Sequence, residues 1–231
     1  MPSWSRLRAA VVAAVRRRPE LVAYVPLATV TALSGALDRR RVHAVTKSVL
    51  VPTLQAGARA RGSRDPLLYA ASSAGWLGDI LLLPRRGKPS VEAQRHQLRS
   101  GAVAFGVQQI GYMAMMARNG VRPKAGRMAA VVPWLACLSV LDMRGGEASA
   151  PDPIITTYGV LLGGMTTMAW SAPSRAMQCG GVLFLASDSM ILIREVLLEG
   201  RVPRVLAEVF VLGTYAAAQA MLIGELVTRR R

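Results

Sequence analysis

Long, mostly uncharged stretches alternate along the chain with short connections that carry many arginines. Each stretch is roughly 17 to 22 residues long, which is close to what an α-helix needs to cross the hydrocarbon core of a membrane. We therefore predict an all-α polytopic membrane protein, a compact bundle of about eight transmembrane helices. The predicted helices are Glu20–Leu37, Val42–Ala58, Pro66–Leu83, Leu98–Ala117, Gly126–Met143, Pro153–Trp170, Ala176–Arg194 and Val205–Val227.

The connections between these stretches are polar and rich in turn-forming residues, and the longest of them is Arg85–Gln97. Small residues recur inside the stretches, as in "GAVAFG" at residues 101–106, and they would let neighbouring helices pack closely. The pattern therefore predicts one transmembrane domain over residues 20–231.

Residues 1–19 combine a basic start with a short apolar centre, as a signal peptide does. However, Arg16, Arg17 and Arg18 follow where a signal peptide would need small residues for cleavage. We therefore predict a basic amphipathic segment that lies on the membrane surface before the first span.

The charge balance is strongly basic, with 29 Lys and Arg against 13 Asp and Glu and a net charge of +16. Such an excess can indicate a nucleic-acid partner, but here 52% of the residues are hydrophobic and the arginines sit at the ends of apolar stretches. Arginines at those positions lie among lipid headgroups and act as topology signals. We expect an integral protein of the cell membrane with no nucleic-acid partner, and the sequence leaves its oligomeric state open.

With eight spans both termini lie on one side of the membrane, and that side collects 16 of the Lys and Arg residues against 12 on the other. The excess favours cytoplasmic termini. Cys137 and Cys179 fall within apolar stretches without metal-like spacing, so we expect two buried small side chains. His43 and His96 lie near span ends, where we expect solvated side chains. The sequence predicts no metal site and no cofactor.

Five polar side chains inside the predicted spans are the most informative, since a charged group there costs roughly 2.5 to 3.5 kcal/mol even on permissive insertion scales. They are Lys47, Asp79, Gln108, Gln109 and Asp188. Because such residues are costly, each is a candidate functional residue.

The three charged members are predicted to lie at similar depth. Asp79 is 13 residues and Asp188 12 residues from the start of its predicted span, and these two spans run in the same direction. At about 1.5 Å per residue, both lie about 18 to 20 Å from the side on which they enter. Lys47 lies about 8 Å from the opposite side, because its span runs the other way. All three fall in the same half of the bilayer, as a shared site requires.

Structural roles remain as alternatives for these residues. Lys47 is close enough to the membrane surface for its ammonium group to reach the headgroups. Asp79 and Asp188 could each pair with an arginine in a loop. The chain contains neither a G-x-S-x-G nor an H-E-x-x-H motif, so serine-hydrolase and metalloprotease chemistry have little support. Carboxylate chemistry and transport remain.

Several segments resemble one known family, the YhhN-like membrane proteins. These segments are "TKSVLVP" (Thr46–Pro52), "GWLGDILLL" (Gly75–Leu83), "GVLFLASDSMIL" (Gly181–Leu192) and "TYAAAQAMLI" (Thr214–Ile223). Each is short, but their order and spacing together are specific to the family. Gly101, Phe105 and Tyr112 are similar to a fourth-span pattern of the family, in which Gln109 stands where a histidine is usual.

The resemblance implies lysoplasmalogenase activity, the hydrolysis of the vinyl ether bond of a lysoplasmalogen to a fatty aldehyde and a glycerophospho-headgroup. This reaction begins with proton delivery to carbon and passes through an oxocarbenium ion, so it suits one protonated and one ionised carboxyl group. An apolar pocket favours the protonated form of a carboxyl group. We expect Asp79 and Asp188 to be this catalytic pair, although the sequence does not assign the acid. The expected substrate-binding residues are Lys47, Gln109, Tyr112, Tyr158, Tyr215 and Gln219.

The glutamine at position 109 bears on this expectation, because an amide does not titrate. Gln109 can orient water or bind substrate, and another lysolipid or ether lipid is a possible substrate. The competing function is a lipid or small-solute carrier that uses the same Asp and Lys side chains without breaking a bond. A catalytically silent membrane scaffold is the third alternative.

Overall fold

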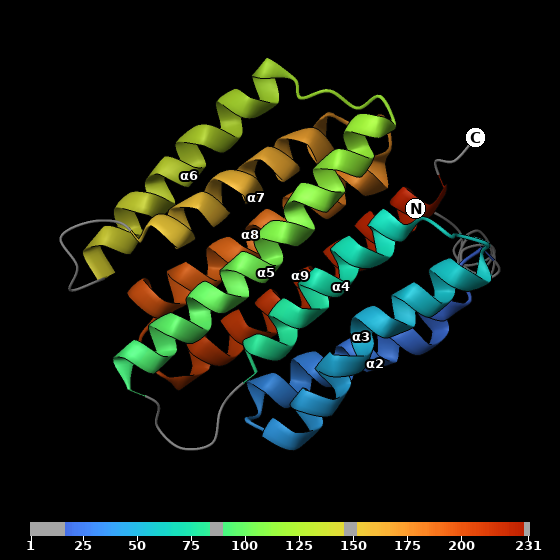
Figure 1. Cartoon of the computed structure of the whole chain (residues 1–231). Coiled ribbons are helices and arrows are strands. Elements are labelled where there is room, and N and C mark those ends of the chain that lie inside the picture. Colours follow the sequence, from blue (N-terminus) through green and yellow to red (C-terminus); the bar gives the residue numbers. More distant parts are fainter. Residues whose placement is uncertain (1–16, 84–89, 146–151, 229–231) are drawn as a thin grey trace, which may run out of the picture.

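The computed structural model describes residues 17–83, 90–145 and 152–228. These residues form eight α-helices, labelled α2 to α9 in Figure 1. The predicted amphipathic segment at residues 1–19 lies almost entirely outside the described residues. The helices are α2 (Glu20–Ala36), α3 (Arg40–Ala60), α4 (Pro66–Leu81), α5 (Val91–Arg118), α6 (Ala125–Gly145), α7 (Pro153–Ser171), α8 (Arg175–Leu197) and α9 (Arg201–Thr228).

Capping side chains fix the starts of four helices. The carboxylate of Asp65 accepts a hydrogen bond from the backbone N–H of Leu67, and Pro66 follows at the first position of α4. Asp152 caps α7 in the same way, again directly before a proline. Each cap satisfies a backbone donor that the helix itself leaves unpaired. Ser90 and Ser174 cap α5 and α8 through their hydroxyl groups.

The eight predicted helices are all present, and the predicted starts of two of them were too late by four residues or more. Helix α5 begins at Val91 instead of Leu98, and α9 begins at Arg201 instead of Val205. Both extensions carry polar side chains, which hydropathy assigns to a loop. A helix can continue beyond the apolar stretch because its backbone groups stay paired while its side chains reach the polar headgroup region.

Helix α9 occupies the middle of the bundle. It packs against α2, α3, α4, α5 and α8, whereas α6 lies at one edge and contacts α7 and α8 (Figure 1). Helices α2 and α3 form the opposite edge. Side chains on α9 can therefore meet residues from α2, α3, α4, α5 and α8.

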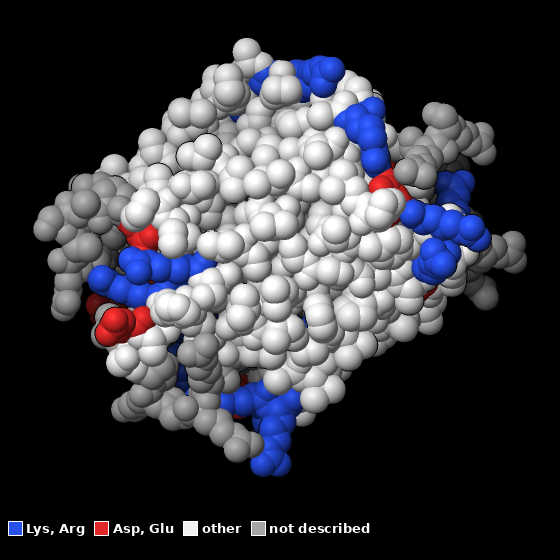
Figure 2. Space-filling model, viewed as in Figure 1, with Lys and Arg blue, Asp and Glu red and all other residues white. Residues whose placement is uncertain are grey.

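On the face of the bundle shown in Figure 2, charged side chains gather toward its two ends, and a broad band with few charges lies between them. Many large apolar side chains are exposed on the outer faces of the helices, among them Val45, Val160 and Leu206, each more than 60% exposed. Only α8 and the segment Arg201–Val227, among the described residues, are long and apolar enough to qualify as spans by themselves. The other helices fall short because they are short or carry polar residues that face neighbouring helices, where lipid does not reach them.

Two expectations about single residues were wrong. Cys137 and Cys179 are exposed on the outer faces of their helices, not buried. An outward thiol is weakly polar and tolerates apolar surroundings, so burial is not required. His43 is buried instead of solvated, with Nδ1 3.1 Å from the carbonyl oxygen of Thr31. That carbonyl gives the imidazole a partner that the sequence does not reveal. His96 is exposed, as expected.

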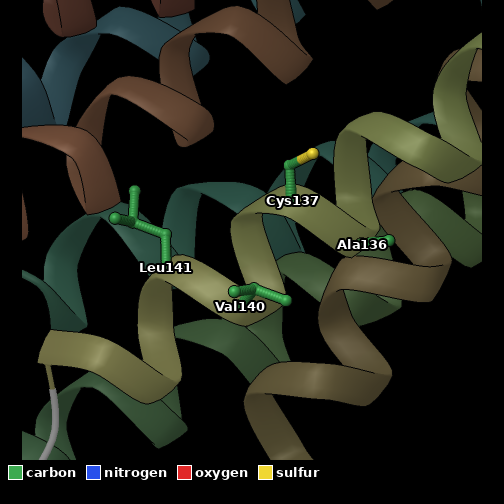
Figure 3. Close-up of a pocket in the computed structure, with 4 residues that line it drawn as sticks. All are labelled: Ala136, Cys137, Val140 and Leu141. Atoms are coloured by element: carbon green, nitrogen blue, oxygen red, sulfur yellow. The ribbon is translucent and has the colours of Figure 1, made fainter.

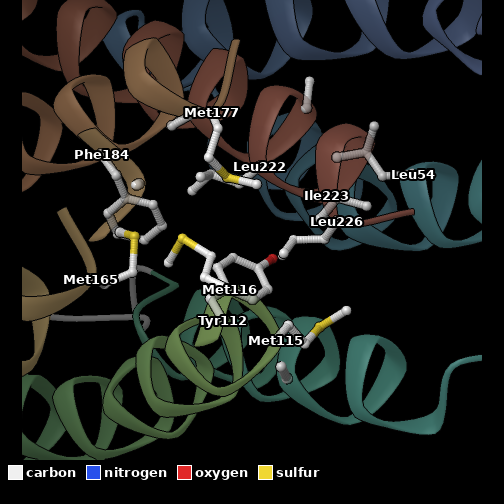
Figure 4. Close-up of a cluster of buried hydrophobic side chains, with 14 of the residues drawn as sticks. Leu54, Tyr112, Met115, Met116, Met165, Met177, Phe184, Leu222, Ile223 and Leu226 are labelled. Atoms are coloured by element: carbon white, nitrogen blue, oxygen red, sulfur yellow. The ribbon is translucent and has the colours of Figure 1, made fainter. Parts of the chain in front are cut away.

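The interior of the bundle is rich in methionine. Met116 from α5 lies with Met165 from α7 and the aromatic ring of Phe184, Met177 from α8 points toward the same region, and Met115 points away from Met165 (Figure 4). Unbranched, flexible methionines fill the irregular gaps that remain where several helices cross. The hydroxyl of Tyr112 enters the same region, so polar and apolar packing meet in the centre of the fold.

Close helix packing makes a specific prediction for Gly181 on α8. A Cβ atom there would lie 2.5 Å from the Cβ atom of Ala169 on α7, and a rigid methyl cannot turn away. We expect Gly181→Ala to lower the free energy of unfolding by about 1–3 kcal/mol through overpacking. Thermal unfolding of the purified protein in detergent measures this change.

The matched control is Gly213→Ala on α9, where a Cβ atom would meet nothing within 4 Å. Because alanine is the better helix former, this variant should be neutral or up to about 1 kcal/mol more stable. Equal unfolding temperatures for the two variants would contradict the packing of α8 on α7 described above.

Candidate active site

Two charged groups predicted to share a depth in the membrane form an ion pair inside the bundle. The ammonium Nζ of Lys47 on α3 lies 3.3 Å from Oδ1 of Asp79 on α4. The Asp79 carboxylate is almost fully buried, and 12% of the Lys47 side chain is exposed. One turn before Asp79, Trp76 donates its indole N–H to the carbonyl oxygen of Ser48, which ties α4 to α3 beside the pair. Lys47 therefore points inward instead of toward the headgroups.

A chain of hydrogen bonds runs from the centre of the bundle to the Asp79 carboxylate. The hydroxyl of Tyr215 donates to Asp79 Oδ2 over 2.7 Å and accepts from the amide Nε2 of Gln219 over 2.8 Å. Gln219 Oε1 accepts from the hydroxyl of Tyr112 and from Nε2 of Gln108. Every link donates toward Asp79, which is the acceptor at the end of the chain. This direction stabilises a negative charge on that carboxylate.

Asp188 on α8 has different surroundings. Its Oδ2 accepts a hydrogen bond from the hydroxyl of Tyr158 on α7, a neutral donor. The flanking hydroxyls of Ser187 and Ser189 donate to backbone carbonyls on α9 and α8, so they do not solvate Asp188. Within the described residues no Lys or Arg forms an ion pair with Asp188, and the residue is half-buried. Asp188 thus lacks the close cation that Asp79 has.

Four aromatic rings, which we call the aromatic cluster, fill the space between the two carboxyl groups. The cluster consists of Phe105, Tyr158, Phe184 and Tyr215. The Phe105 ring centroid lies 6.5 Å from that of Tyr158 and 6.0 Å from that of Tyr215, and Phe184 packs edge-on against Tyr215 at 5.5 Å. The tyrosine hydroxyls at its two sides are the ones that bond Asp188 and Asp79.

The two carboxyl groups belong to one region of the protein, although they do not touch. Helices α4 and α8 do not pack directly on each other within the described residues, because α5, α7 and α9 lie between them. The carboxyl groups are connected instead through the aromatic cluster, in which the rings of Tyr158 and Tyr215 both pack on Phe105 and their hydroxyls bond Asp188 and Asp79. The arrangement therefore offers two carboxyl groups with unlike neighbours on either side of an apolar centre.

Gln109 on α5 is completely buried and lies beside the hydroxyl of Tyr158. Neither its amide oxygen nor its amide nitrogen has a hydrogen bond of good geometry within the described residues. Buried amide groups are normally paired, because an unpaired one costs about 1–3 kcal/mol. The amide of Gln109 thus has both a donor and an acceptor free for a further group.

The structure brings the expected site residues together in two connected groups. Lys47, Asp79, Tyr215, Gln219 and Tyr112 form one, and Asp188, Tyr158 and Gln109 form the other. Sequence reasoning assigned no role to Phe105 or Phe184, and it singled out Gln108 only as a polar residue inside a span. Phe105 and Phe184 read as ordinary apolar span residues, and only their position in the family-like segments distinguishes them.

The described hollows on the surface do not contain these residues. One is a shallow apolar depression on α6, lined by Ala136, Cys137, Val140 and Leu141 (Figure 3). The other is an apolar groove between α4 and α5. Both face outward along the helices, and neither includes a carboxyl group of the site. Within the described part of the chain, no group of three or more His, Cys, Asp and Glu side chains is arranged to hold a metal ion.

The hydrogen-bond chain leads to a stability prediction for Tyr215. In Tyr215→Phe, Asp79 loses a donor and Gln219 loses an acceptor, both of them buried. Since a bond to a charged group contributes about 1.5–3 kcal/mol, we expect the free energy of unfolding to fall by about 2 kcal/mol. Tyr69→Phe is the control: it removes one bond to the carbonyl of Ser63 from a half-buried side chain and should cost less than half as much. Equal losses in thermal unfolding would argue against the chain.

The comparisons with known proteins give one match. A sequence model of the YhhN family matches residues 42–226. This segment runs from the first turn of α3 almost to the end of α9, so it contains every residue of the site. No curated protein and no solved structure matches the chain significantly.

Proposed function

The chain belongs to the YhhN family of polytopic membrane proteins, which includes lysoplasmalogenases, and from this premise we propose that it hydrolyses the vinyl ether bond of a lysoplasmalogen or a related ether lysolipid. The products are a fatty aldehyde and a glycerophospho-headgroup. The observation that carries the proposal is the unlike environment of two carboxyl groups that flank one apolar centre.

Asp188 is the proton donor in this proposal. Among the described residues, the only side chain that forms a hydrogen bond with Asp188 is Tyr158, through its neutral hydroxyl. No cation of the described residues forms an ion pair with Asp188. An apolar surrounding without a close cation favours the neutral form of a carboxyl group. A neutral carboxyl group is what the first step needs, because the vinyl ether accepts a proton on its β-carbon.

Asp79 remains ionised in the same proposal. Lys47 compensates its charge, and the hydrogen-bond chain through Tyr215 donates toward it. A fixed negative charge across the aromatic cluster stabilises the oxocarbenium ion that forms when the substrate is protonated. The rings of Phe105 and Phe184 keep water away and present an apolar wall to the alkenyl chain.

The reaction then proceeds in three steps. Asp188 gives its proton to the β-carbon, and the π electrons of the double bond form the new C–H bond. Water adds through its oxygen to the α-carbon of the oxocarbenium ion and returns one proton to the Asp188 carboxylate. In the resulting hemiacetal the C–O bond to the glycerol breaks, the hydroxyl proton passes to the glycerol oxygen, and the aldehyde leaves.

Aldehyde release tests the proposal directly. Purified wild-type protein in detergent or proteoliposomes is incubated with a lysoplasmalogen, and free aldehyde and headgroup product are measured by mass spectrometry. We expect both products in equal amounts. Lipid or solute flux across proteoliposomes without aldehyde would identify a carrier instead, and neither product nor flux would leave a scaffold.

We also propose that both termini face the cytoplasm and that the protein resides in the cell membrane. With an even number of spans both termini lie on one side of the membrane, and by the predicted spans that side collects 16 of the Lys and Arg residues against 12 on the other. In this orientation the Lys47–Asp79 pair lies nearer the opposite face, since Asp79 is close to the end of α4. A reporter fused to the C-terminus and active only outside the cytoplasm should remain silent.

A further inference from the structure

The unpaired amide of Gln109 carries an inference that rests on the proposed function and extends it. Gln109 is fully buried on α5, beside the Tyr158 hydroxyl that bonds Asp188. Its Oε1 and Nε2 both lack hydrogen-bond partners in the described residues, whereas in the neighbouring Gln108 only Oε1 is unpaired and Nε2 donates to Tyr112 and Gln219. A buried group with one free donor and one free acceptor fits a small molecule that is itself both donor and acceptor.

We propose that Gln109 holds the water molecule that adds to the oxocarbenium ion. Water has two protons and two lone pairs. Gln109 Oε1 accepts one proton and Gln109 Nε2 donates to one lone pair. One lone pair is left to attack the α-carbon, and one proton is left for the Asp188 carboxylate, which has just lost its own. Gln109 is thus assigned a positioning role, and it exchanges no proton itself.

The hydrogen bonds of Gln108, the preceding residue, give its amide a different role from that of Gln109. The Nε2 of Gln108 donates to Tyr112 and to Gln219, so this amide belongs to the hydrogen-bond chain that ends at Asp79. One residue further along a helix the side chain turns by about 100°, and Gln109 consequently faces Tyr158 on α7 instead of Gln219 on α9. The two adjacent amides therefore serve opposite sides of the aromatic cluster.

The test measures which nucleophile, water or methanol, captures the oxocarbenium ion, in addition to the rate of turnover. Since water adds after the proton transfer to carbon, the loss of a water site changes what captures the ion. Turnover of a lysoplasmalogen is measured in buffer with added methanol, and the ratio of mixed methyl acetal to aldehyde is determined by mass spectrometry. In Gln109→Met, which keeps the length of the side chain but has no hydrogen-bonding amide, we expect this ratio to rise on the order of ten-fold, as the loss of two hydrogen bonds implies.

Two further variants make the result specific. Gln109→Asn retains an amide but withdraws it by one carbon, and it should raise the acetal ratio by less than Gln109→Met does. Gln55→Met is the matched control on α3, since its amide donates only to the hydroxyls of Ser72 and Ser73 away from the aromatic cluster. This control should keep the wild-type ratio. Because the amide of Gln109 has no hydrogen bond of good geometry within the described residues, Gln109→Met should fold with an unfolding temperature at or above that of wild type.

The outcomes separate the two proposals. Normal aldehyde release with an unchanged acetal ratio in Gln109→Met would overturn the water site and leave the proposed function standing. A raised KM with an unchanged ratio would also overturn it, because Gln109 would then bind the substrate itself. A lower unfolding temperature of Gln109→Met with an unchanged acetal ratio would mean that the amide only stabilises the fold, and it would also overturn the water site. No aldehyde from the wild-type protein would overturn the proposed function and this inference together.

Discussion

Replacement of Asp188 by asparagine is expected to reduce aldehyde release by about 10²- to 10⁴-fold, the contribution typical of a general acid. Asparagine has the same shape, and its side-chain oxygen can still accept the hydrogen bond from Tyr158. What it lacks is an acidic proton. The vinyl ether has no other way to become an electrophile, since it reacts only after its β-carbon is protonated. KM should change little, because the binding contacts of the site remain.

Asp152→Asn supplies the control for this experiment. Asp152 caps α7 at the membrane surface and pairs with Arg99, and asparagine is an equally good capping residue. Its turnover should match that of wild type. The two variants are compared by the initial rate of aldehyde formation at equal amounts of folded protein, verified by size-exclusion chromatography. A near-wild-type rate in Asp188→Asn would remove the proposed acid.

Most of the fold follows from the sequence, because a bilayer limits what a chain can do. Backbone groups in lipid must be paired within the segment, so a stretch of apolar residues of the right length has to be a helix. Polar connections and capping residues such as Asp65 and Asp152 then mark where the helices begin. The starts of α5 and α9 were predicted too late because hydropathy does not identify the polar turns of a helix that extends beyond the hydrocarbon core.

The candidate site was predictable in its charged members and not in its apolar ones. A carboxylate inside an apolar span is energetically costly, so Asp79 and Asp188 can be recognised as candidates from the sequence. Counting residues from the start of each span then predicts that they lie at a similar depth. Phe105 has no such signal, because an aromatic ring in a span is ordinary. Which helices meet also depends on how all side chains pack, which explains why the buried state of His43 escaped prediction. The pairing of Lys47 with Asp79, instead of with headgroups, depends on the same packing.

Removal of either charge of the Lys47–Asp79 pair is expected to lower the free energy of unfolding more than Gly181→Ala or Tyr215→Phe does. In Lys47→Met the carboxylate keeps its hydrogen bond from Tyr215 but loses its cation, and in Asp79→Asn the ammonium group is left without its counterion. An uncompensated charge in the protein interior costs about 3–5 kcal/mol. Each single variant should therefore lose about that much free energy of unfolding, measured by denaturation in detergent.

The double variant Lys47→Met/Asp79→Asn should be more stable than either single variant, because it leaves no charge unpaired. The exposed pair of Arg40 and Asp38 is the control, and Asp38→Asn should change the free energy of unfolding by less than about 0.5 kcal/mol. All three variants of the buried pair should release almost no aldehyde, since the oxocarbenium ion loses its fixed counter-charge in each. If the losses of the single variants simply add in the double variant, Lys47 and Asp79 are not a pair, and the assignment of Asp79 as the ionised partner of Asp188 loses its support.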